Sequence, residues 1–181
     1  MNTVLIVGLG NSLLQDDGVG VHVARLLITN SPSGTDVIEG GTDLMSLAPY
    51  LERYSQVLVI DAMDAGERPG TLYQCALDDL EPSGQTVSLH ELGLRAVLEF
   101  IDSARRPNIT ILGIQPERIG YGLELSARLQ ARLPEVAGAA REIVVELQNS
   151  RAARCRCRRE AETLFASNGG DNEEQETKVK P

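Results

Sequence analysis

Short extended segments alternate along the chain with longer segments of helical period, and this alternation constrains the fold most. The segments that predict strands are 4–7, 36–39, 57–60, 70–76 and 109–114. Apolar residues recur every three or four positions in the segments between or after them, namely 18–29, 43–54, 88–101 and 123–147. Such alternation predicts a three-layer α/β fold, in which helices cover both faces of a mostly parallel, twisted sheet of about five strands.

The composition of each segment predicts its place in that fold. Segment 57–60 is the most apolar, so we expect it at the centre of the sheet, and 70–76 at an edge. Asp17 is well placed as the N-cap of the first helix. Pro134 should kink or divide the last helix, because proline removes a backbone hydrogen bond.

The composition changes near residue 150, which divides the chain of 181 residues into two parts. We expect one α/β domain over 1–149 and a charged, disordered tail over 150–181. The tail begins with five arginines within 151–159 and becomes polar after 168. It is interpreted as solvated chain, and the alternative is contact with an acidic partner surface.

The net charge of −9 excludes several classes of protein. An acidic body does not attract a phosphate backbone or an anionic membrane, and a chain without Trp offers few stacking surfaces for nucleic acid. No apolar run reaches the ~18 residues that a membrane span needs. Three cysteines, Cys75, Cys155 and Cys157, make no disulfide framework. We therefore expect a cytoplasmic protein that binds neither nucleic acid nor membrane.

The loop after the first strand, residues 8–18, carries Gly-x-Gly and invites comparison with dinucleotide-binding loops. That fingerprint needs a third glycine where this chain has Leu13. Asp16 and Asp17 also stand where a pyrophosphate requires bare backbone N–H groups, and two carboxylates would repel it. The loop is therefore interpreted as one that presents carboxylates.

Three possible metal ligands follow from the predicted topology, namely one of the neighbouring Asp16 and Asp17, with Asp61 and His90. In open α/β sheets, ligands bind at the carboxyl ends of the strands, and the fold brings all three groups to that rim. Each has an ordinary structural reading by itself, as a helix cap, a loop residue or a first-turn histidine in the Ser88–Glu91 capping box. Two carboxylates and an imidazole make an open coordination set, to which a partner would supply the remaining ligands.

The same residues resemble motifs of a known family. The matching segments are Gly8–Gly20, Glu39–Thr42, Ile60–Ala62, Pro69–Thr71, Ser88–Leu94 and Gly113–Glu117. In this order, across about residues 1–148, they resemble the hydrogenase maturation proteases, which process the large subunit of nickel–iron hydrogenases. The tail after Ser150 lies outside the resemblance. One departure is Glu39, where the family commonly has Asp before the Gly-Gly-Thr turn.

The resemblance implies an activity and a ligand set. These endopeptidases remove a C-terminal extension from the large-subunit precursor after nickel has been inserted. By motif, the nickel-binding residues are Asp17, Asp61 and His90, and the nickel would arrive with the substrate. A carboxylate at the rim, from Asp16, Glu39 or Asp61, would orient or deprotonate the attacking water, as in an aspartyl protease.

Two alternatives from other classes stay open at this point. The first is a non-catalytic chaperone that binds nickel or the precursor through the same ligands, and the second is a nucleotide-binding α/β enzyme. A cysteine protease is disfavoured, because Cys75 lies within a predicted strand and no histidine is near it in sequence.

Overall fold

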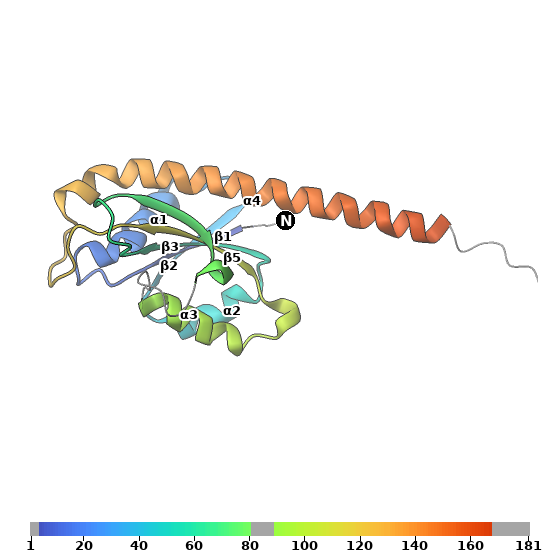
Figure 1. Ribbon diagram of the computed structural model, residues 1–181, viewed down its shortest axis with the longest axis horizontal. Helices are drawn as coiled ribbons and strands as arrows, with labels where there is room; N and C mark the ends of the chain where they lie inside the picture. The colour runs from blue at the N-terminus through green and yellow to red at the C-terminus, as the bar shows by residue number, and fades with distance from the viewer. Residues whose placement is uncertain (1–3, 81–88, 168–181) are drawn as a thin grey trace, which may run out of the picture. The chain divides into compact units, whose positions relative to one another are not determined.

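The computed structural model describes residues 4–80 and 89–167, and it contains the predicted sheet. Five strands lie in the order β2 (Thr35–Gly41), β1 (Val4–Leu9), β3 (Gln56–Ala62), β5 (Asn108–Ile114) and β4 (Leu72–Ala76). The first four run parallel, and β4 pairs antiparallel with β5 at the edge. The predictions of a central 57–60 strand and an edge strand within 70–76 are confirmed (Figure 1).

Helices cover both faces of the sheet, as expected. On one face lie α1 (Val19–Thr29) and the part of α4 (Ala127–Ser167) that belongs to the main unit, and on the other lie α2 (Ala48–Leu51) and α3 (Leu89–Glu99) (Figure 1). Short 3₁₀ turns occur at Asp16–Gly18, Leu44–Leu47, Leu77–Asp79 and Ser103–Arg105. The contacts divide the chain into two units, 1–148 and 149–181.

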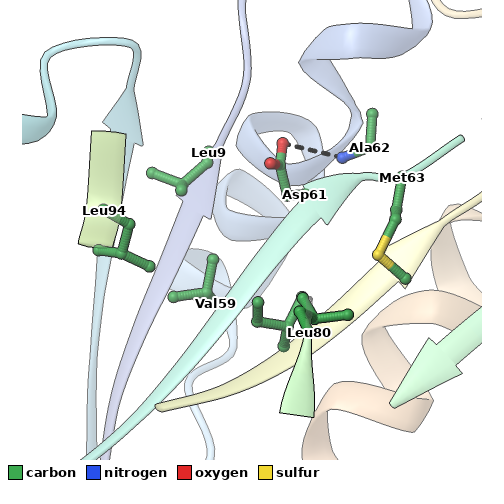
Figure 2. A pocket seen from close by; sticks show the side chains of 8 residues that line it. Leu9, Val59, Asp61, Ala62, Met63, Leu80 and Leu94 are labelled. Atoms are coloured by element: carbon green, nitrogen blue, oxygen red, sulfur yellow. Dashed lines mark hydrogen bonds between the residues drawn. The ribbon is translucent and has the colours of Figure 1, made fainter. Parts of the chain in front are cut away.

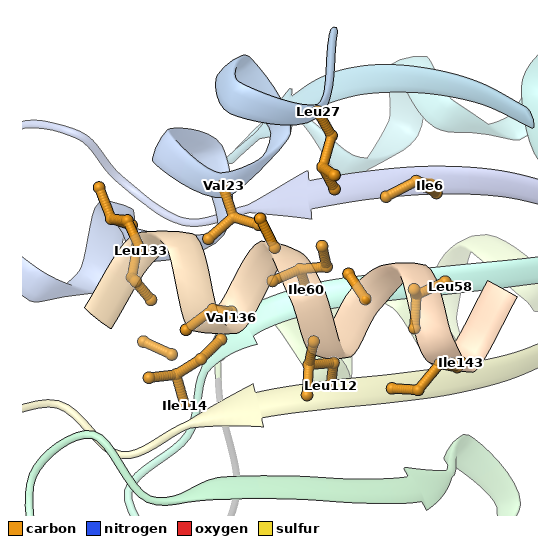
Figure 3. Close-up of a cluster of buried hydrophobic side chains, with 14 of the residues drawn as sticks. Ile6, Val23, Leu27, Leu58, Ile60, Leu112, Ile114, Leu133, Val136 and Ile143 are labelled. Carbon is orange, nitrogen blue, oxygen red and sulfur yellow. The ribbon is translucent and has the colours of Figure 1, made fainter. Parts of the chain in front are cut away.

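Alternation along the central strands builds two cores. In β1, Val4 and Ile6 belong to the core beneath α1 and α4, whereas Leu5 and Val7 belong to the core beneath α2 and α3. Figure 3 shows the first core, where Leu58 and Ile60 of β3 meet the two helices. Because side chains of a strand point alternately to opposite faces, a sheet covered on both sides needs continuous apolar strands.

Four local expectations need correction or lie outside the described residues. Gly18, not Asp17, is the N-cap of α1. The helix predicted over 43–54 is a 3₁₀ turn followed by the four-residue α2. Helix α4 continues past Pro134 undivided and extends to Ser167, beyond the predicted end at 147. Ser88 of the proposed capping box lies outside the described residues. In the described part of the chain, no helix could cross a membrane.

Candidate active site

Glycines bring the first helix close to the central strands. Gly10 has a φ of 121°, and a Cβ on it would lie 1.9 Å from the carbonyl oxygen of Asp17. A Cβ on Gly20 would lie 2.1 Å from the carbonyl oxygen of Ile60. Only glycine allows both approaches, because any other side chain would collide with backbone. The start of α1 is thereby held against the end of β3, and the loop that carries Asp17 lies beside the strand that carries Asp61.

Asp16 is a structural carboxylate. Its side chain is completely buried, with a relative exposure of 0%, and it accepts three backbone hydrogen bonds. The donors are the N–H groups of Glu117, at 2.9 Å, Arg118, at 3.0 Å, and Ser126, at 2.6 Å. A buried charge is tolerated when it is fully hydrogen-bonded. Asp16 therefore fixes the loop between β5 and α4 against the opening loop.

Asp17 faces a different environment, although it is the next residue. Its side chain is half-buried, and Oδ2 accepts a hydrogen bond of 2.7 Å from the backbone N–H of Asn11. This bond closes the opening loop upon itself and orients the carboxylate. The N-cap role expected for Asp17 is wrong, because the carboxylate bonds to the preceding loop instead of the first turn of α1.

The structure brings Asp61 and His90 into direct contact. His90 Nδ1 lies 3.3 Å from Asp61 Oδ1, and the two side chains are only 13% and 6% exposed. The same carboxylate oxygen accepts a hydrogen bond of 2.9 Å from the N–H of Ala62. Asp61 stands at the carboxyl end of β3, and His90 is the second residue of α3. Two elements on either side of the rim thus meet as the predicted topology requires.

The electrostatics of this pair favour a protonated imidazole. The hydrogen bond that His90 donates to Asp61 raises the pKa of His90 above its usual 6.5, against the opposing effect of burial, and the negative charges of Asp61 and Asp17 raise it further. The field of Asp17 therefore reaches His90. When His90 is neutral, a hydrogen bond through Nδ1 to the carboxylate leaves Nε2 as the nitrogen that can bind a metal.

A small apolar pocket lies beside Asp61 (Figure 2). Among the described residues, the side chains that line it besides Asp61 are apolar, and they are Leu9, Val59, Ala62, Met63, Leu80, Leu94 and Ile111. Apolar walls exclude water, and charges interact more strongly where water is excluded. The Asp61 carboxylate is therefore solvated poorly on this side, where Ala62 donates a hydrogen bond to it and His90 contacts it.

The structure separates other candidates from this pair. Glu39 accepts a hydrogen bond of 3.0 Å from Arg25 Nε and forms an ion pair with that guanidinium. His22 lies on α1, where burial and the charge of Arg25 lower its pKa and Glu39 opposes them. Across 4–80 and 89–167, no group of three His, Cys, Asp or Glu side chains is arranged to hold a metal ion. Asp17, Asp61 and His90 thus share the rim without forming a closed cluster.

Sequence reasoning missed the role of Gln115, which is only 5% exposed. Its Oε1 accepts a hydrogen bond of 2.8 Å from the N–H of Ala65, and its Nε2 donates one of 2.9 Å to Asp64 Oδ1. The bond from Gln115, with another from the N–H of Gly66, lowers the pKa of Asp64. Gln115 therefore fixes the loop that follows Asp61. Its position between a strand and Pro116 was the available signal.

Comparison with known proteins shows which family the chain belongs to. The family model for hydrogenase maturation proteases matches residues 21–143. The hydrogenase expression/formation protein HoxM of Azotobacter vinelandii is 32% identical over 159 residues, which cover 83% of this chain and 76% of that protein. The hydrogenase 2 maturation protease of Escherichia coli is 29% identical over 154 residues, which cover 79% of this chain and 93% of that protein.

Solved structures share the fold. The [NiFe] hydrogenase maturation protease HybD from Thermococcus kodakarensis has a TM-score of 0.66 at 28% identity and covers 78% of this chain and 99% of its own. The maturating endopeptidase HybD of E. coli has a TM-score of 0.67 at 23% identity, and the match covers 82% of this chain and 93% of that protein. This likeness supports the fold alone. The family model spans most of the main unit, and the chain is therefore a member of the hydrogenase maturation protease family, a group of endopeptidases.

Proposed function

We propose that this enzyme removes the C-terminal extension of a nickel–iron hydrogenase large-subunit precursor after nickel insertion, and that it recognises the nickel in that substrate. Family membership supports a protease over a chaperone or a nucleotide-binding enzyme. The nickel belongs to the precursor and leaves with the processed subunit. The cytoplasmic location stays a prediction.

The observation that carries the proposal is the Asp61–His90 pair at the rim, within the field of Asp17. These oxygen and nitrogen donors suit a divalent transition metal but include no thiolate, so they should hold nickel weakly. The set would close only when the precursor supplies the metal and its other ligands.

Besides its place among the proposed nickel ligands, Asp61 has two tasks in this scheme. It orients His90 through Oδ1, as a carboxylate commonly orients a metal-binding histidine. It also stands in a poorly solvated position, where a carboxylate is well suited to accept a proton from the water that attacks the scissile carbonyl. That proton can then pass to the leaving amine, so that one carboxylic acid and one amine form as the peptide bond breaks.

Glu39 and Asp16 are poorer candidates for handling this water. The carboxylate of Glu39 is paired with Arg25, and that of Asp16 is saturated by three backbone N–H groups. The proposal therefore places Asp17, Asp61 and His90 at the reacting centre and leaves Asp16 and Glu39 as supporting residues.

The test compares alanine variants at the three positions with nickel-loaded precursor, following the mass of the precursor over time. Asp17→Ala, Asp61→Ala and His90→Ala should each lower the rate of processing by at least about a hundredfold, because each would remove a group needed at the reacting centre. Glu39→Gln is the matched control and should process at nearly the wild-type rate. Full processing by Asp17→Ala or His90→Ala would remove the assignment.

A further inference from the structure

The opening loop and the loop between β5 and α4 form a paired ledge beside the active site. Gly122 donates a hydrogen bond of 3.0 Å to the carbonyl of Leu13, and Gln15 donates one of 3.0 Å to the carbonyl of Gly122. Isolated bridges join Leu14 to Gly122 and Gln15 to Ile119. The two loops, far apart in sequence, therefore have one backbone arrangement.

Side-chain packing fixes the ledge further. Gln15 has a φ of 53°, which is rare for a residue with a side chain. A Cβ on Gly122 would lie 2.9 Å from Gln15 Cγ, so the Gln15 side chain lies directly against the Gly122 backbone. Asp16 adds its hydrogen bonds to Glu117, Arg118 and Ser126 from the same loop. The surface that this ledge presents is therefore built before any partner arrives.

Four large apolar side chains on the ledge are exposed to solvent, and together we call them the apolar platform. Leu13 is 61% exposed, Ile119 54%, Tyr121 95% and Leu123 69%. Three of the ten exposed large apolar residues in the described part of the chain thus fall within 119–123. Single exposed apolar residues are ordinary, but a group of them on a fixed backbone marks an interaction surface.

The platform is continuous with the active site. Leu13 and Asp17 belong to the same short loop, whose Asn11 N–H holds the Asp17 carboxylate. Asp16, between them, ties that loop to the backbone on both sides of 119–123. A protein that contacts Leu13 of the platform therefore contacts the same loop that carries Asp17. A second copy of this chain in that position would obstruct a protein substrate, whereas the substrate itself would gain contact area there.

We infer that the apolar platform docks an apolar surface of the hydrogenase large-subunit precursor next to its scissile bond. This inference rests on the proposed function. Contacts at three side chains are too few for a specific complex, since stable interfaces between proteins bury about 1,200–2,000 Å² in total. A tyrosine alone can bury about 200 Å², and aromatic residues are frequent energetic centres of interfaces. The platform supplies the area that the reacting centre lacks.

The experiment measures the processing rate against the concentration of nickel-loaded precursor for Tyr121→Lys and for the double variant Leu13→Ser/Tyr121→Ser. At 95% exposure, Tyr121 should be replaceable without loss of folding, which a thermal melt verifies. The KM should rise at least about tenfold, as expected for loss of one aromatic anchor. The kcat should change little, because neither residue touches the reacting atoms.

The matched control is Phe100→Ser. Phe100 is 74% exposed and directly follows α3, in the connection that leads to the amino end of β5, at the opposite end of the strands from the rim. Its KM should equal that of the wild type. A wild-type KM for both platform variants would overturn the inference, and so would an equal rise for Phe100→Ser. A wild-type dimer in sedimentation that Tyr121→Lys dissociates would also overturn it, with a second copy as the occupant.

Direct binding separates this inference from the proposed function. Immobilised precursor should retain the wild-type enzyme and the Phe100→Ser enzyme equally, and Tyr121→Lys at least about tenfold more weakly. Binding with this pattern but without any cleavage would reject the proposed function and support the platform. Cleavage of the precursor, with unchanged binding by Tyr121→Lys, would support the proposed function and reject the docking role of the platform.

Discussion

Replacement of Asp16 by alanine tests whether the buried carboxylate holds the two loops together. The change leaves the N–H groups of Glu117, Arg118 and Ser126 without their acceptor in a region where Asp16 has no exposure to water. Hydrogen bonds to a charged group contribute about 1.5–3 kcal/mol each, and neighbouring bonds are not additive, so we expect a loss of about 4 kcal/mol in the free energy of unfolding. For a folded unit of this size the melting temperature should fall by about 8–16 °C.

Urea unfolding followed by circular dichroism measures the loss, with Asp16→Asn and Asp17→Ala as comparisons. Asparagine can retain the two bonds that Oδ2 accepts but turns its NH₂ toward the Ser126 N–H, so it should cost about half as much as alanine. Asp17→Ala loses one hydrogen bond from Asn11 and should cost about 1 kcal/mol while abolishing processing. A loss below about 0.5 kcal/mol for Asp16→Ala would refute the reasoning, because that is the effect of an ordinary surface change.

Three further predictions concern the packing, titration and charge of the site. Gly20→Ala should destabilise the protein by about 1–3 kcal/mol, because its Cβ would collide with the Ile60 carbonyl. Gly138→Ala on α4, with no neighbour within 4 Å, should instead stabilise it by about 0.5–1 kcal/mol. Equal effects of the two substitutions in urea unfolding would contradict this prediction. In NMR titration of the two histidines, His22 should titrate below 6.5 and His90 above it. The stability that neutral His22 contributes is present above pH 6.5 and is lost as the pH falls through its lowered folded pKa. The stability that charged His90 contributes is present below pH 6.5 and is lost as the pH rises through its raised folded pKa. Titration of both histidines on the same side of 6.5 would show that the two environments are misassigned. Glu39→Gln should lower stability by less than about 1 kcal/mol, because its partner Arg25 is half-exposed and exposed ion pairs contribute little; a larger loss in thermal unfolding would mean that the pair has a greater structural role.

The sheet could be predicted because the residues of each central strand indicate by themselves that the strand is buried. Segments 4–7 and 57–60 are apolar at every position, and only strands covered on both faces require this. The short α2 could not be predicted in this way. Leu44, Leu47 and Leu51 have helical spacing, but the chain forms a 3₁₀ turn that Asp43 caps through Ser46, and Pro49 then starts a new helix. Both arrangements bury leucines on one side.

The candidate site shows where sequence reasoning stops. The rule for parallel sheets brought Asp61 and His90 to one rim, and the structure places them in contact. The difference between Asp16 and Asp17 could not be predicted, since the two acids are neighbours of the same type. Asp16 is structural because three backbone N–H groups donate to it. These donors lie 101–110 residues away in sequence, so no local pattern indicates them. Gln115 escaped notice for the same reason, as it acts on a loop about 50 residues earlier.

The proposal that the enzyme recognises nickel bound to its substrate is tested most directly by mass spectrometry. Nickel-loaded and nickel-free precursor are each incubated with the wild-type enzyme, and their masses are compared. We expect the loaded precursor alone to lose its C-terminal extension, because we propose that Asp17, Asp61 and His90 bind nickel only together with the ligands that the precursor supplies. Addition of nickel to the enzyme, followed by its removal from solution, should not rescue the nickel-free precursor. Cleavage of both precursors at the same rate would contradict the account.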